Sequence, residues 1–136
     1  MANGADWKSY FSQLEGQGYL CTADTKGVVN AAPFARPRVQ PDGTWAFGLT
    51  DRRTGRNLAE NPHALYLYDA GGYRGCRATL ELDRFAEEGE LLEQVRTSAD
   101  HIVGPGAGAA VKRVAFFRVA AVRPLVGAGT PDAQER

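Results

Sequence analysis

The sequence contains only two cysteines, two histidines and one methionine in 136 residues, and it has no net charge. Sixteen basic side chains balance sixteen acidic ones, so there is no general electrostatic attraction to nucleic acid or to an anionic membrane. No apolar run approaches the ~20 residues of a membrane span, and the first residues lack the charged-then-apolar pattern of a signal peptide. We therefore expect a cytoplasmic protein with no membrane and no nucleic-acid partner.

Metal-ligating side chains are equally scarce. His63 and His101 have no partners at metal-ligand spacing, and Cys21 and Cys76 do not form a C-x-x-C pair. Because both cysteines fall within expected strands, we interpret them as buried thiols in a reducing compartment. We predict no metal site.

Common catalytic motifs are also missing. There is no G-x-S-x-G turn for a serine nucleophile. The glycine-rich run at residues 104–110 lacks G-K-[ST] and precedes an expected strand, so we interpret it as a loop and not as a phosphate loop. No side chain stands out as a general acid, and we name no catalytic residue.

The most informative stretch is residues 43–68, whose pattern predicts a strand, a short basic helix and a second strand. Trp45, Phe47 and Leu49 alternate with smaller residues, which is the two-residue period of a strand. A basic cluster follows at once: Arg52, Arg53, Thr54 and Arg56.

This cluster falls where a strand ends and a helix over residues 53–61 is expected to begin, with Asp51 as the candidate N-cap. At a helix start, outward N–H groups and the helix dipole favour an anion. Guanidinium groups add forked donors that match phosphate oxygens. The cluster therefore predicts phosphate binding, although a solvated helix face is the alternative from sequence alone.

The rest of the chain has the pattern of an antiparallel β protein. The other predicted strands cover residues 18–24, 28–38, about 65–68, 74–83 and 111–126, and the other predicted helices cover 5–17 and 85–102. Pro33 and Pro37 require an edge position or a bulge in the second strand. Six strands joined mainly by short turns favour a closed or partly closed barrel in a single domain, residues 1–127, followed by a disordered tail at 128–136.

Four stretches in this order resemble a known family. They are G-Y-L-C-T-A-D-T-K-G-V-V-N-A-A-P-F, D-G-T-W-A-F-G-L-T, R-R-T-G-R-N-L-A-E-N-P and Y-R-G-C-R-A-T-L-E-L. The region from about residue 18 to 82 resembles the FMN-binding split-barrel superfamily, which includes pyridoxamine 5′-phosphate oxidase and its small relatives. The resemblance implies a mainly β fold, a six-stranded antiparallel split β-barrel of Greek-key type with covering helices. It also implies a homodimer with FMN at the subunit interface.

The resemblance assigns site residues by position. Those implied for the flavin ring lie on the second strand: Ala32, Pro33, Phe34 and Ala35. Those implied beside the ring or the ribityl chain lie on the third: Phe47, Gly48 and Thr50. Those implied at or next to the phosphate follow: Arg52, Arg53, Thr54 and Asn57.

Two departures from the family pattern bear on function. Thr54 replaces a lysine of the phosphate turn, and Gly75 replaces a glutamine that reaches the flavin in the oxidase itself. The substrate-binding C-terminal segment of that oxidase has no counterpart, which argues against pyridoxamine phosphate as the substrate. The prediction is an FMN-binding oxidoreductase or electron-transfer protein acting on a small molecule.

Several alternatives stay open at this point. One is a cofactor-free dimeric split barrel that acts as a binding or regulatory protein. Others are a relative that binds FAD or the deazaflavin F420, and a heme-binding relative that uses His63 or His101 as axial ligand.

Overall fold

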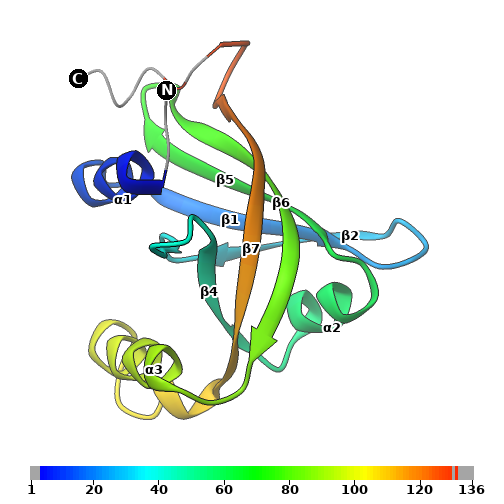
Figure 1. Cartoon of the computed structure of the whole chain (residues 1–136), viewed down its shortest axis with the longest axis vertical. Helices are drawn as coiled ribbons and strands as arrows, with labels where there is room; N and C mark the ends of the chain where they lie inside the picture. The colour runs from blue at the N-terminus through cyan, green and yellow to red at the C-terminus, as the bar shows by residue number, and fades with distance from the viewer. Residues whose placement is uncertain (1–3, 130, 132–136) are drawn as a thin grey trace.

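The computed structural model describes residues 4–129 and 131, with side chains from Trp7 onward. Three α-helices, one 3-10 turn and seven strands make up this part of the chain (Figure 1). The helices are α1 (Gly4–Gln13), α2 (Arg53–Glu60) and α3 (Glu90–Ile102), and the 3-10 turn is η1 (Gly108–Ala110). The strands are β1 (Gln17–Ala23), β2 (Val29–Phe34), β3 (Arg38–Val39), β4 (Trp45–Thr50), β5 (His63–Gly71), β6 (Arg74–Ala86) and β7 (Val111–Pro124).

All seven strands belong to one sheet in the order β2-β1-β5-β6-β7-β4-β3, and every pair is antiparallel. The long strands β6 and β7 cross the whole molecule (Figure 1). Their pairing shifts twice, between Thr79 and Leu80 and between Leu82 and Arg84. Such irregularities bend a strand, and here they accompany the curling of the sheet around its core. The predicted fold class, a mainly β antiparallel split barrel with covering helices, is confirmed. The predicted number of six strands is wrong, since the structure has seven.

Aromatic side chains fill the interior of the curled sheet. Trp45, Tyr66, Tyr68 and Phe117 have no exposed surface. Helix α1 covers one opening, where the ring of Phe11 meets Trp45 at 5.1 Å and Tyr68 at 5.2 Å in edge-to-face geometry. These contacts help to bury the apolar face of α1, which consists of Trp7, Tyr10 and Phe11.

A second cluster lies on the outer face of β4 and β7, under α3. Leu92 of α3 is 1% exposed and packs with Ala46, Val111, Val114 and Phe116. The stretch at residues 114–117 is therefore buried on both faces, whereas much of β7 after it is exposed.

The two edges of the sheet come from one short piece of chain. Strands β2 and β3 lie at opposite ends of the strand order, and only residues 35–37 separate them. The edge position predicted from Pro33 and Pro37 is thus confirmed. The single strand expected at residues 28–38 is wrong, since the chain leaves β2 after Phe34 to form β3 on the far edge.

Other boundaries also differ from the predictions. Helix α1 ends at Gln13, and α3 begins at Glu90, because β6 continues to Ala86 by pairing with β7. The loop expected at residues 69–73 is a tight hairpin, since β5 extends to Gly71. Most of the predicted tail lies outside the described residues. No helix in the described part is long and apolar enough to cross a bilayer.

Candidate functional site

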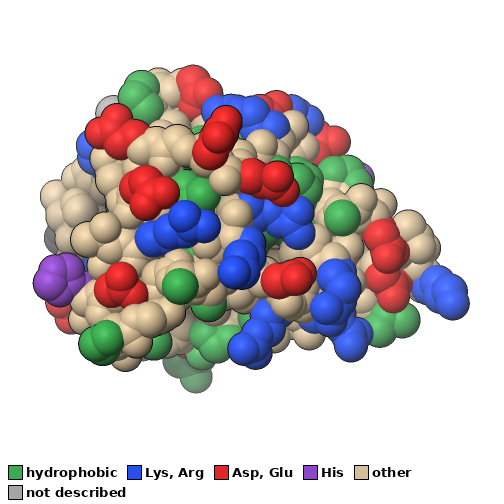
Figure 2. All heavy atoms as spheres, turned by 90° about the horizontal axis from the view of Figure 1, so that it is seen from below, with side chains coloured by type: hydrophobic (Ala, Val, Ile, Leu, Met, Phe, Trp, Pro, Cys, Tyr) green, Lys and Arg blue, Asp and Glu red, His purple; other side chains and the backbone are tan. Residues whose placement is uncertain are grey.

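A pocket of about 460 Å³ opens between the edge strand β2 and the start of α2. We call it the α2 pocket. Its strand wall consists of Asn30, Ala31, Ala32 and Pro33, and its helix wall consists of Asp51, Arg52, Arg53, Thr54 and Arg56. Lys and Arg side chains gather at the lower right of the surface in Figure 2, over the end of the molecule that carries α2 and the β1–β2 hairpin. The volume of the α2 pocket lies within the range of about 300–1,000 Å³ typical of ligand pockets.

Two tethers hold α2 against β1 and the hairpin. The buried side-chain amide of Asn57 donates a hydrogen bond to the hydroxyl of Thr22 at 3.1 Å. At the other end of the helix, the Thr25 hydroxyl and backbone N–H both lie 3.3 Å from the Glu60 carboxylate. Leu58 is 2% exposed and joins the core. The start of α2 therefore has a fixed position relative to β2.

No side chain caps the start of this helix. Arg52 occupies the N-cap position in extended conformation, and no side-chain hydrogen bond reaches the first turn. The prediction that Asp51 is the N-cap is wrong. The first N–H groups of a helix have no intrahelical acceptor, so an uncapped start leaves donors available for an anion.

The three arginines of the α2 pocket make no ion pair and donate no side-chain hydrogen bond within residues 4–129 and 131. Arg52, Arg53 and Arg56 are all exposed, and the single carboxylate on the pocket wall belongs to Asp51. Three like charges beside uncapped helix N–H groups make the pocket electropositive. The arrangement suits a phosphate group.

A fourth arginine approaches the same helix turn from β7. A Cβ atom placed on Gly55 would lie 3.5 Å from Nη2 of Arg113. The Arg113 guanidinium lies over the ring of Phe85 at 4.7 Å and pairs with Glu87 at 3.7 Å. Sequence reasoning missed this residue, because only the pairing of β4 with β7 brings it near α2.

The structure brings five of the eleven predicted site residues into the α2 pocket. They are Ala32, Pro33, Arg52, Arg53 and Thr54. Arg56, the fourth member of the basic cluster predicted to bind phosphate, also lines the pocket. Three further lining residues were outside the predicted site: Asn30, Ala31 and Asp51. Their position next to predicted residues, before Ala32 in the sequence and before Arg52, is the signal that could have identified them.

Three other predicted residues make contacts within the chain that explain their identity without a ligand. Phe47 is buried in the core, with its ring 5.0 Å from that of Tyr66. A Cβ atom on Gly48 would lie 2.5 Å from Cγ1 of Val95, so the glycine lets α3 approach the sheet. Asn57 forms the buried tether described above. None of the three lines the α2 pocket.

The remaining three lie beside the pocket. Phe34 packs on the core, and its carbonyl and that of Ala35 accept a bond from the Tyr66 hydroxyl at 3.3 and 3.2 Å. Thr50 is exposed, and its carbonyl accepts the N–H of Arg52 at 2.9 Å. These contacts fix the ends of the two strands that lead into the pocket.

Gly75 has a backbone reason to be glycine. Its φ is +144°, and a Cβ atom there would collide with the carbonyl oxygen of Tyr68. No larger side chain fits this position without moving the β5–β6 hairpin. The glutamine that the resemblance places here therefore has no equivalent in this chain.

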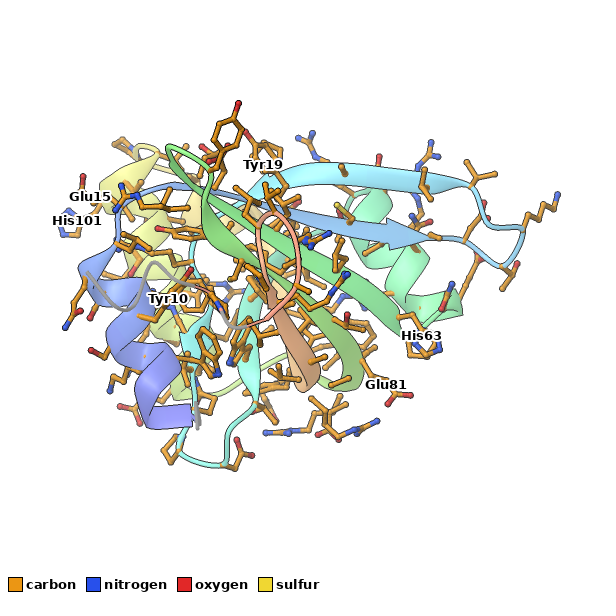
Figure 3. The ribbon with its side chains drawn as sticks, turned by 90° about the horizontal axis from the view of Figure 1, so that it is seen from above. Tyr10, Glu15, Tyr19, His63, Glu81 and His101 are labelled. Atoms are coloured by element: carbon orange, nitrogen blue, oxygen red, sulfur yellow. The ribbon has the colours of Figure 1, made fainter. Side chains whose placement is uncertain are left out.

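The histidines and cysteines form no site in the described part of the chain. His63 and His101 are exposed and lie at opposite ends of the molecule (Figure 3). No group of three or more potential metal ligands occurs within residues 4–129 and 131. Both cysteines are free thiols, and burial raises the pKa of Cys76 to about 12.

No family model matches the sequence, and no curated protein matches it either. Solved structures do. An FMN-binding protein from Syntrophomonas wolfei has a TM-score of 0.76 and 19% identity over 92% of this chain and 87% of its own. HupZ of Group A Streptococcus has a TM-score of 0.71 and 21% identity over 96% and 98%.

An F420 reductase has a TM-score of 0.66 and 20% identity over 85% of this chain and 96% of its own. Identities at this level establish the fold alone. The chain therefore has the fold of the FMN-binding split-barrel superfamily.

Proposed function

We propose that this chain is a flavoprotein that holds FMN by its phosphate in the α2 pocket and exchanges electrons with a small molecule. One observation carries the proposal. Three arginines without ion pairs in the described structure surround a helix start that no side chain caps. A phosphate group would satisfy both the guanidinium groups and the helix N–H donors.

Within this proposal each wall of the pocket has a role. Arg52, Arg53 and Arg56, with the N–H groups of the first turn of α2, would hold the phosphate. The small side chains of Ala31 and Ala32 leave space on β2 for a flat ring. When bound, FMN supplies hydride or electron transfer, and the protein places and shields it.

We also propose that the protein acts as a homodimer. The β1–β2 hairpin exposes apolar surface: Val28 is 55% exposed and Val29 is 78% exposed. Tyr19 on the neighbouring strand is 37% exposed and lies on the same side of the molecule as β2 (Figure 3). A second copy on this face would bury these side chains and close the open side of the α2 pocket.

F420 is the second candidate, because one structural neighbour is an F420 reductase. A phosphate anchor suits FMN, FAD and F420 equally. Heme has less support, since neither His63 nor His101 lines the α2 pocket. The cofactor-free alternative also has less support, because it leaves three neighbouring arginines without counter-charge.

The test is identification of the bound chromophore. The full chain is purified, its absorption spectrum is recorded, and any released chromophore is identified by mass spectrometry after denaturation. The preparation is also titrated with FMN, FAD, F420 and heme. Saturable 1:1 binding of FMN supports the proposal. F420 or heme in its place rejects FMN, and no binding of any of the four rejects the cofactor function.

A further inference from the structure

A second pocket, larger than the α2 pocket, lies among α1 and α3, which are on the other side of the molecule from α2 (Figure 1). It has a volume of about 550 Å³ and lies between α1, the segment that joins β2 to β3, and α3. We call it the α1 pocket. It shares no lining residue with the α2 pocket. The phosphate anchor of the proposed cofactor therefore does not account for it.

The charged side chains that line the α1 pocket are all basic: Lys8, Arg36 and Arg38. Two carboxylates of α3 neighbour the lining residues Leu91 and Gln94 in the sequence, but neither lines the pocket. Glu90 accepts a hydrogen bond from Gln94 at 3.4 Å, and Glu93 pairs with Arg96 at 3.3 Å. The three cations thus face a pocket wall that has no counter-charge of its own.

Neighbouring elements hold both arginines in place. Nη1 of Arg36 donates to the backbone carbonyl of Phe11 at 2.6 Å, and Nη2 of Arg38 donates to the Ser98 hydroxyl at 2.8 Å. A guanidinium group has five N–H donors, so each contact leaves further donors for a ligand. Because the side chains are already ordered, binding costs less conformational entropy.

The rest of the wall is apolar or uncharged. Phe11, Val39 and Leu91 contribute apolar surface, and Pro37 and Pro41 stiffen the chain on either side of β3. A site with convergent donors on one side and apolar surface on the other suits a small molecule with a charged head and an apolar body.

We propose that the α1 pocket binds a small organic anion, a carboxylate or a phosphate ester with an apolar or aromatic body. Arg36, Arg38 and Lys8 hold the anionic group, and Phe11 and Leu91 contact the body. The site is independent of the cofactor in the α2 pocket.

The test uses phenyl phosphate and benzoate as probes and benzyl alcohol as the uncharged control. Amide chemical shifts of the full chain are recorded during titration, in wild type and in the Arg52→Gln/Arg53→Gln variant. This variant removes two charges of the α2 pocket, so the result does not depend on the proposed flavin function. We expect saturable shifts at Val39 and Gln40 with at least one anion and none with benzyl alcohol.

Single substitutions then locate the anionic group. Arg38→Gln should weaken anion binding about tenfold. The Lys8 side chain donates no hydrogen bond within the described structure, and Lys8→Gln should weaken anion binding about threefold. Lys26→Gln on the exposed β1–β2 turn is the matched control and should bind as the parent does. If Arg38→Gln fails to fold, Lys8→Gln decides alone. Absent shifts, equal shifts with benzyl alcohol, or an unchanged Lys8→Gln affinity would overturn the proposal.

Discussion

The side-chain amide of Asn57 on α2 donates a hydrogen bond to the hydroxyl of Thr22 on β1, and both side chains are buried. This bond joins the helix that begins at the arginine cluster to β1, the strand next to the sheet edge formed by β2. We predict that Asn57→Ala lowers the free energy of unfolding by about 1–3 kcal/mol, because it leaves the Thr22 hydroxyl without its partner. Urea denaturation measures the change.

A double-mutant cycle provides the control for this prediction. Thr22→Val removes the same bond from the other side, so the double variant Asn57→Ala/Thr22→Val should lose less stability than the sum of the single variants. Strict additivity would show that the two residues act independently.

The arginine cluster gives the second prediction. Arg52→Gln/Arg53→Gln should weaken FMN binding by about 100-fold, since two charge-assisted contacts to the phosphate are lost. The exposed Arg123→Gln on β7 is the matched control and should bind FMN as wild type does. Quenching of FMN fluorescence measures both affinities. Equal affinities for the two variants would contradict the proposal that Arg52 and Arg53 bind the phosphate.

Gly48 distinguishes packing from ligand contact. A Cβ atom at this position would lie 2.5 Å from Cγ1 of Val95 and 3.2 Å from Cγ1 of Val111. We predict that Gly48→Ala lowers the free energy of unfolding by about 1–3 kcal/mol through overpacking. The affinity for FMN should stay unchanged, because the clash is with α3 and not with the α2 pocket.

Relief of the clash tests this explanation of Gly48. Val95→Ala in the Gly48→Ala background should recover part of the stability measured by thermal unfolding. If Gly48→Ala instead keeps wild-type stability but loses FMN binding, Gly48 belongs to the ligand site.

Because the Cys76 thiol is buried, we predict that the protein loses stability at alkaline pH. Burial raises its pKa to about 12, whereas an unfolded cysteine titrates near pH 8.5. The unfolded state therefore loses its proton first, so the stability that this thiol contributes is complete below about pH 8.5 and decreases as the pH rises toward 12.

Urea denaturation between pH 8 and pH 11 should show this loss, with a smaller slope in Cys76→Ala. Burial also raises the pKa of Tyr66, so part of the slope should persist in that variant. A slope identical to wild type would mean that the thiol has the same pKa in both states.

Local patterns predicted the strands and the arginine cluster because those signals are contained in a few neighbouring residues. Boundaries set by distant pairing were wrong. Residues 85 and 86 were assigned to a helix, yet Phe85 pairs with Ala115 and Ala86 with Val114. The end of β6 pairs with the first part of its antiparallel partner β7, which is nearly thirty residues away in the sequence.

The sequence predicted the charged residues of the candidate site but not all of the residues that form its walls. The arginines adjoin one another in sequence, so their proximity needed no tertiary information. Phe47 and Gly48 belong to the correct strand, but that strand faces the core on one side and α3 on the other. The α1 pocket escaped prediction entirely, because α1, β3 and α3 meet only in the folded chain.

The prolines at the two edges of the sheet have a further consequence for aggregation. An exposed strand edge can act as a template for strands of other molecules. Here the two terminal strands include or adjoin Pro33 and Pro37, which have no N–H to offer an incoming strand, and β3 is only two residues long. Concentrated solutions of this protein should therefore resist fibril growth by strand addition.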